Sequence, residues 1–258
     1  MDFKIKNELF VVCGGSSGFG LAIGELLLSE GAQVILVARG HDKLDKLQHK
    51  WGLQVEILPA DISQSSSIKL LYERVGERRL AGIVVNAGGP PAKGFLETEL
   101  QEWDDAYQTL VRWKVELTQT FIPKFMEQGY GRMLYIESVS VKQPVPNLVL
   151  SNSLRMAVVG FVKTLSDEVA DKGINLNIMA PGYHDTAAMQ RLFAKKSEMT
   201  GQSPEQARAA FENELKMGRM GKAEEFASLA IWLLSPLSAY VTGQTFSHDG
   251  GLVKGVFG

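Results

Sequence analysis

The sequence predicts an α/β fold in which helices cover both faces of a parallel sheet. Short, continuous apolar runs alternate along the chain with longer stretches whose apolar residues recur at helical spacing. Strands that are separated by single helices form parallel sheets buried on both faces. A glycine-rich turn also joins the first apolar run to the first amphipathic stretch. We therefore expect one domain, residues 1–258.

Seven apolar runs are expected to form the strands: 9–14, 32–38, 53–58, 82–87, 131–138, 174–180 and 243–249. The expected helices lie between them: 19–30, 41–50, 63–79, 99–128, 150–172 and 223–235. Because crossovers between parallel strands are right-handed, this alternation predicts a doubly wound, Rossmann-type sheet of about seven strands. Residues 186–217 are a polar, helix-forming insertion before the last helix. Two interpretations of the insertion stay open, a lid over a substrate pocket and added surface.

Composition excludes several classes of function. The chain has 27 basic and 29 acidic residues and a formal charge of −2, so it offers no positive surface for nucleic acid or an anionic membrane. No apolar run reaches the length of a spanning helix or a signal peptide. Cys13 is the single cysteine, and the four histidines have no metal-ligand spacing. We expect a cytoplasmic protein without a metal site.

The turn after the first strand has the sequence CGGSSGFG, in which Gly14, Gly18 and Gly20 form G-x-x-x-G-x-G. Glycines allow a tight turn and a close approach of the backbone, and the following helix offers N–H groups and a positive dipole to a pyrophosphate. The strand before and the amphipathic helix after the turn make a dinucleotide site more specific than a glycine triplet alone. The candidate pyrophosphate residues are Gly14, Ser16, Ser17, Gly18, Phe19 and Gly20.

The end of the second strand indicates which dinucleotide is preferred. An acidic side chain here commonly binds the ribose 2′-hydroxyl of NAD, whereas this chain has Ala38 and then Arg39. An arginine suits the 2′-phosphate of NADP, although a solvated arginine at a strand end is the alternative. The sequence favours NADP(H) over NAD(H).

These features resemble the short-chain dehydrogenase/reductase family over almost the whole chain. The turn is similar to the family's T-G-x-x-x-G-x-G, with Cys13 in place of threonine. The motifs ADIS, VNAGG and APGYHDT, and the ending YVTGQTFSHDGG, follow in the family's order. The resemblance implies further cofactor contacts around the adenine, the fourth strand and the nicotinamide: Asp61, Ile62, Asn86, Ala87, Gly88, Arg155, Pro181, Gly182, His184 and Thr186.

The catalytic motif of the family is where this chain departs. Family members use a serine, a tyrosine thirteen residues later and a lysine four residues further on, often with an asparagine. Ser138 takes the serine position, but Ser151 and Arg155 stand where tyrosine and lysine are expected. A looser alignment places Leu110 at the asparagine position. The candidate catalytic residues are therefore Ser138, Ser151 and Arg155.

The substitution changes the chemistry to be expected. A serine hydroxyl is a far weaker acid than a phenol, and arginine cannot donate a proton near neutral pH. Hydride transfer to an alkene conjugated with a carbonyl needs less, because the developing enolate requires hydrogen bonds or positive charge. We therefore expect an NADPH-dependent reductase of a small carbonyl, enone or oxo-acid substrate. Tyr183, His184 and Lys142 are candidates for a substitute acid.

Two other interpretations stay open. The chain could be a non-catalytic NADP-binding protein that acts as a sensor, scaffold or partner subunit, or one that uses the fold with a vestigial nucleotide site. The paired long helices at 99–128 and 150–172 resemble those through which family members form dimers and tetramers. The resemblance thus implies a homo-oligomer whose ligand is a small molecule.

Overall fold

The structure is a computed structural model that describes residues 2–86 and 88–256. Its seven-stranded sheet has the order β3-β2-β1-β4-β5-β6-β7, and all neighbouring strands are parallel. The strands are β1 (Leu9–Cys13), β2 (Gln33–Ala38), β3 (Val55–Pro59), β4 (Leu80–Val85), β5 (Gly131–Ile136), β6 (Ile174–Pro181) and β7 (Thr245–His248). The predicted doubly wound, Rossmann-type sheet is confirmed.

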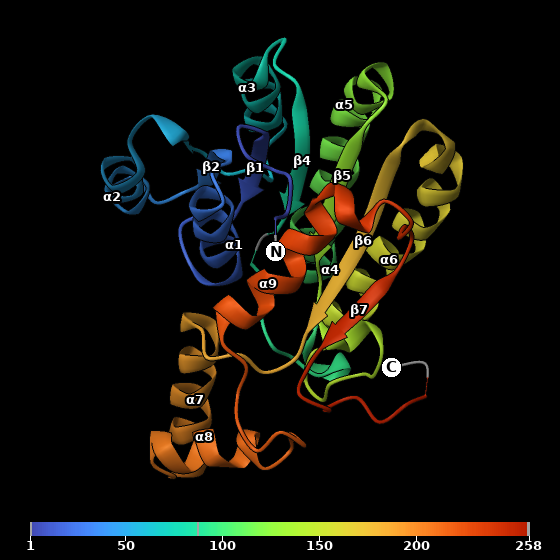
Figure 1. Cartoon of the computed structure of the whole chain (residues 1–258). Helices are drawn as coiled ribbons and strands as arrows, with labels where there is room; N and C mark the ends of the chain where they lie inside the picture. Colours follow the sequence, from blue (N-terminus) through green and yellow to red (C-terminus); the bar gives the residue numbers. More distant parts are fainter. Residues whose placement is uncertain (1, 87, 257–258) are drawn as a thin grey trace.

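Helices cover both faces of this sheet (Figure 1). On one face lie α1 (Gly18–Ser29), α2 (His41–Trp51) and α9 (Ala223–Leu234). On the other lie α3 (Ser65–Val75), α4 (Leu100–Tyr107), α5 (Trp113–Gln128) and α6 (Val149–Val169). Every strand residue from β1, β4, β5 and β6 is buried, which explains their continuous apolar runs.

The expected helix 99–128 is interrupted in the structure. A π-helical turn, Gln108–Arg112, separates α4 from α5. Within this region Trp113 Nε1 donates to the carbonyl of Thr109 at 2.8 Å, and Thr109 Oγ1 donates to the carbonyl of Asp105 at 2.9 Å. Side chains that bind backbone carbonyls disturb the regular helical ladder. Periodicity alone did not indicate this interruption.

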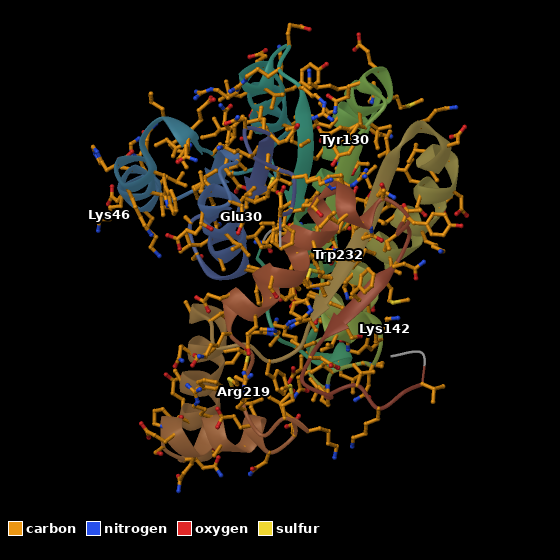
Figure 2. The ribbon with its side chains drawn as sticks, in the orientation of Figure 1. Glu30, Lys46, Tyr130, Lys142, Arg219 and Trp232 are labelled. Carbon is orange, nitrogen blue, oxygen red and sulfur yellow. The ribbon has the colours of Figure 1, made fainter. Side chains whose placement is uncertain are left out.

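The insertion 186–217 forms α7 (Ala187–Thr200) and α8 (Pro204–Glu212), which project beyond the end of the sheet (Figure 1). These helices have their own apolar cluster, in which Met189 and Phe193 are buried with Ala207. Arg219, labelled in Figure 2, binds Glu225 at 2.6 Å and so ties the segment after α8 to α9. The insertion is a small packed unit attached at the carboxyl end of β6.

The core predicts a test of packing. Phe10 in β1 is fully buried, so Phe10→Ala should lower the free energy of unfolding by about 3–5 kcal/mol, because a cavity replaces the ring. The matched control Leu53→Ala removes a side chain that is fully exposed and should change it by less than about 0.5 kcal/mol. Urea denaturation with an unchanged slope measures both. Equal effects of the two substitutions would contradict the assigned core.

Candidate active site

The carboxyl ends of the strands open into one cleft of about 940 Å³. Chain segments that follow β1, β2, β3, β4 and β6, together with the end of β5, line it. The cleft lies where the order of strands reverses, since β1 leads to β2 on one side and pairs with β4 on the other. Crevices at such a reversal are the usual ligand sites of doubly wound sheets.

The glycine turn forms one wall of this cleft. Gly14 and Gly18 have φ values of +67° and +54°, which favour glycine. A Cβ on Gly20 would lie 2.3 Å from the carbonyl oxygen of Gly14, so this contact between α1 and the turn requires the absence of a side chain. Ser17 precedes α1 without a capping hydrogen bond from its side chain, which leaves the helix start suited to an anion. The turn fits a dinucleotide pyrophosphate.

Most of the expected cofactor residues line the cleft: Gly14, Ser16, Ser17, Gly18, Phe19, Arg39, Asp61, Ile62, Asn86, Gly88, Arg155, Pro181 and Thr186. Three expected residues are absent from this lining among the described residues: Gly20, Gly182 and His184. Ala87 lies outside the described residues. Gly182 packs closely against the segment after β7, because a Cβ there would meet Cα of Asp249 at 2.8 Å.

A second cation accompanies Arg39. Lys43, in the first turn of α2, also lines the cleft, and both side chains are exposed. The two residues are four positions apart at a strand end and a helix start, so two positive groups face the part of the cleft beyond β2. The sequence analysis missed Lys43, although its spacing from Arg39 was a usable signal.

A buried ion triad lies at the inner wall of the cleft. Glu137 follows β5 and its side chain is fully buried. Its Oε1 accepts a hydrogen bond from Lys114 Nζ of α5, and its Oε2 accepts one from Arg155 Nη1 of α6 at 2.9 Å. One carboxylate therefore binds two cations from two different helices. Neither Lys114 nor Glu137 was a candidate in the sequence analysis.

Arg155 is fixed on two sides and faces the cleft. Its Nε donates to Ser151 Oγ at 3.0 Å and its Nη1 donates to Glu137. Its Nη2 lies 3.4 Å from the position that a Cβ on Gly89 would take, and Gly89 also lines the cleft. The Arg155 side chain is 9% exposed, so its remaining donors are largely shielded from water. Fixed donors of this kind stabilise a negatively charged oxygen.

The pKa of Lys114 is lowered, and burial is the largest cause. Burial lowers the pKa of its ammonium group, the Glu137 carboxylate opposes this, and the Arg155 guanidinium lowers it further. The hydrogen bond to Glu137 also favours the charged form. Breaking a buried pair by removing one partner typically costs about 3–5 kcal/mol, so the three groups depend on one another.

The two candidate serines are placed differently. Ser138 is half-buried, and its Oγ accepts a hydrogen bond from the backbone N–H of Ser140 at 3.2 Å. Ser151 is buried and accepts from Arg155. Neither serine is among the described residues that line the cleft. The structure thus brings Ser151 and Arg155 together and joins them to Glu137, with Ser138 beside Glu137 in the chain.

Comparison with known proteins identifies the family. A family model described as enoyl-(acyl carrier protein) reductase matches residues 14–253. The chain belongs to the short-chain dehydrogenase/reductase family. It is 31% identical to dehydrogenase/reductase SDR family member 6 of Xenopus laevis, over 96% of this chain and 98% of that protein.

Solved structures of the family superpose closely. L-sorbose reductase from Gluconobacter frateurii, complexed with NADPH and L-sorbose, has a TM-score of 0.93 at 27% identity and covers 99% of this chain and 100% of its own. An actinorhodin polyketide ketoreductase with NADPH has a TM-score of 0.90 at 30% identity and covers 96% of this chain and 98% of its own. The chain is therefore a member of a family of oxidoreductases that includes NADPH-binding reductases.

Among the described residues of this family member, the candidates for a substitute acid are held by other partners. Tyr183 donates to Glu214 at 3.1 Å, and burial, followed by the nearby carboxylate, raises the pKa of its phenol to about 12. His184 is 2% exposed and its Nε2 lies 2.9 Å from His248 Nδ1. Lys142 is outside the cleft lining. Leu110, at the looser asparagine position, is buried in the π-helical turn and supplies no amide.

Within residues 2–86 and 88–256, no helix is both long and apolar enough to cross a membrane. The same residues contain no group of three or more His, Cys, Asp or Glu side chains that could hold a metal ion.

The histidine pair predicts a dependence of stability on pH. Burial lowers the pKa of His184 below its ordinary value of about 6.5, although its contact with the Gly182 carbonyl opposes the shift. The imidazole therefore binds a proton more tightly in the unfolded chain than in the folded protein. The free energy of unfolding is highest above about pH 6.5 and declines as the pH falls below that value.

Thermal unfolding at pH 7.5 and pH 5.5 measures this effect. The loss of stability between the two values should be smaller in His184→Gln than in the wild type. His49→Gln, which alters an exposed histidine, should behave as the wild type does. An unchanged pH dependence in His184→Gln would show that His184 does not titrate in this way.

Proposed function

We propose that this protein is an NADPH-dependent reductase whose substrate is a small conjugated enone, with oxo-acids and other carbonyl compounds as related candidates. The observation that carries the proposal is Arg155, a fixed guanidinium at the inner wall of the cleft, in a site where serine replaces the family's tyrosine. Reductases complexed with NADPH among the related structures support the cofactor.

The cleft offers residues for each part of NADPH. The turn from Gly14 to Phe19 would hold the pyrophosphate, and Asp61 with Ile62 would contact the adenine. Pro181 and Thr186 line the same cleft as Glu137 and Arg155, and the nicotinamide would lie among these residues. When bound there, the cofactor supplies the hydride.

Arg39 and Lys43 support a preference for the 2′-phosphate, because both are cations beside the end of β2. Replacing both, in Arg39→Gln/Lys43→Gln, should weaken NADPH binding about a hundredfold or more, since each charge-assisted hydrogen bond contributes about 1.5–3 kcal/mol and two are lost. Binding of NADH should change little. The control Lys46→Gln alters an exposed lysine of α2, labelled in Figure 2, which is absent from the cleft lining among the described residues.

Fluorescence titration of both nucleotides measures these affinities. Equal weakening of NADPH and NADH binding would indicate that the two cations do not recognise the 2′-phosphate. Tighter binding of NADH than NADPH by the wild type would reverse the proposed preference.

The chemistry suits a conjugated alkene. The substrate's β-carbon accepts the hydride, the electron pair of the C=C bond moves to form an enolate, and the negative charge collects on oxygen. Arg155 provides N–H donors and positive charge for that oxygen. Water supplies the proton that the α-carbon finally takes. Direct reduction of a ketone instead needs an acid at the oxygen, which general acid catalysis normally speeds about 10²–10⁴-fold.

A second candidate function is a non-catalytic NADP-binding protein. The observation that favours it is the serine geometry, since the described cleft lining contains neither Ser138 nor Ser151. This candidate and the reductase both bind NADPH, so binding alone does not separate them. Turnover on a panel of substrates does.

The proposal also covers the insertion 186–217 and the pair of long helices at 99–128 and 150–172. The helices α7 and α8 are proposed as a lid, supported by their separate apolar cluster and by Thr186, which lines the cleft directly before α7. The homo-oligomer that the family resemblance implies is supported by exposed apolar side chains on α4 and α6, Tyr107 and Met156.

Oxidation of NADPH against matched ketones, conjugated enones and quinones tests the function. The wild type should reduce an enone and turn over the matched ketone at least about 10²-fold more slowly, because it lacks the acid. In Ser151→Tyr/Arg155→Lys, which restores the family's pair, ketone reduction should appear. Ketone reduction without enone reduction by the wild type would contradict the proposal. Tight NADPH binding with no turnover on the panel would support the non-catalytic candidate.

A further inference from the structure

A buried lysine stands behind the cleft without reaching it. Lys114 is 1% exposed, lies in α5 and is absent from the lining of the cleft among the described residues. Its ammonium group donates to Glu137 Oε1. Removing an ammonium ion from water costs several kcal/mol, so a charged lysine at this position needs an interaction that offsets this cost. A single acid–base pair of Glu137 and Arg155 would have left the site electrically neutral.

The charges of the triad sum to a positive value. Lys114 and Arg155 each contribute one positive charge and Glu137 contributes one negative charge. The two carboxylate oxygens are divided between the two cations, Oε1 with Lys114 and Oε2 with Arg155. Because Lys114 engages one oxygen, Glu137 orients Arg155 without neutralising the whole triad.

Three other carboxylates line the cleft but oppose this charge weakly. Asp61 accepts hydrogen bonds from the backbone N–H and the hydroxyl of Ser63. Glu102 is paired with Lys93 at 2.6 Å, and Asp105 accepts a hydrogen bond from Gln101 at 3.0 Å. Asp105 is exposed, so water screens its charge, whereas the triad is almost entirely shielded from water. The inner wall of the cleft is therefore positive.

We propose that Lys114 is a positioning residue that acts as the counter-ion of Glu137 and so leaves the charge of Arg155 available to an oxyanion in the cleft. The ligand class is a small molecule with a negatively charged oxygen next to an unsaturated carbon, such as an enolate or a phenolate. The enolate part rests on the proposed function, whereas the binding of a stable oxyanion does not.

A coloured phenol tests the charge without any turnover. The probe is 4-nitrophenol, whose neutral and anionic forms absorb differently, added to the protein with NADP⁺ present. The wild type should bind the anion and lower the pH at which the bound probe ionises. In Lys114→Met this pH should rise by about 1 unit or more, because loss of the ammonium group leaves Glu137 to neutralise Arg155 in a site shielded from water.

The control and the complementing variant separate charge from packing. Lys124→Met alters another lysine of α5, which donates to the Gly76 carbonyl away from the cleft, and should leave the probe unchanged. Lys114→Met/Glu137→Gln removes both charges, keeps an amide oxygen for Arg155 and returns the site to one net positive charge. Probe ionisation in this double variant should return to within about 0.5 unit of the wild type.

The double variant also serves if Lys114→Met fails to fold, since it leaves no unpaired buried carboxylate. The proposal would be overturned if the probe ionised at the same pH in Lys114→Met as in the wild type. It would also be overturned if the probe ionised at the same pH in a folded double variant as in Lys114→Met. Failure of the wild type to bind the probe would overturn it as well.

Kinetics distinguish this inference from the proposed function. The substrate is an enone, and the assay is run well below the melting temperature. Lys114→Met should lower kcat about tenfold, which equals a shift of about one pH unit in the ionisation of the probe, and should change KM less than about twofold. An unchanged kcat would reject the role of Lys114 while leaving the reductase intact. A shifted probe in a protein that reduces no enone would reject the proposed substrate while leaving the charge assignment intact.

Discussion

The carboxylate of Glu137, bound by two cations, is the interaction on which the site depends. It joins the end of β5 to α5 through Lys114 and to α6 through Arg155, and Arg155 in turn binds Ser151. None of these groups could be buried alone without a large desolvation cost. Together they form a positively charged wall where the family motif has a tyrosine and a lysine.

Much of the fold could be predicted from the sequence, because its cause is local. Apolar strands between single amphipathic helices required a parallel, doubly wound sheet, and the glycine turn lies in the cleft at the carboxyl ends of its strands. The π-helical turn Gln108–Arg112 was missed because helical periodicity does not report the side-chain contacts of Thr109 and Trp113 that accompany it. The inner arrangement of 186–217 was also left open, since polar helices give weak patterns.

The parts of the candidate site that could be predicted are those whose position follows from the local order of the chain. The cofactor turn and Arg39 follow strand ends, where chain order fixes the geometry. Lys114 and Glu137 were missed because charged side chains are normally solvated, and their pairing exists only once α5 packs on β5. The signals were present, a lysine in the helical run RWKVEL and a glutamate ending the apolar run MLYIES.

The most direct test of a site built for enolate formation is the position at which hydride is delivered. A conjugated enone incubated with the protein and NADPH deuterated at the transferable C4 position gives a product that nuclear magnetic resonance can locate atom by atom. The account predicts deuterium on the carbon β to the carbonyl, with the carbonyl intact. Deuterium on the former carbonyl carbon, in an allylic alcohol, would contradict it.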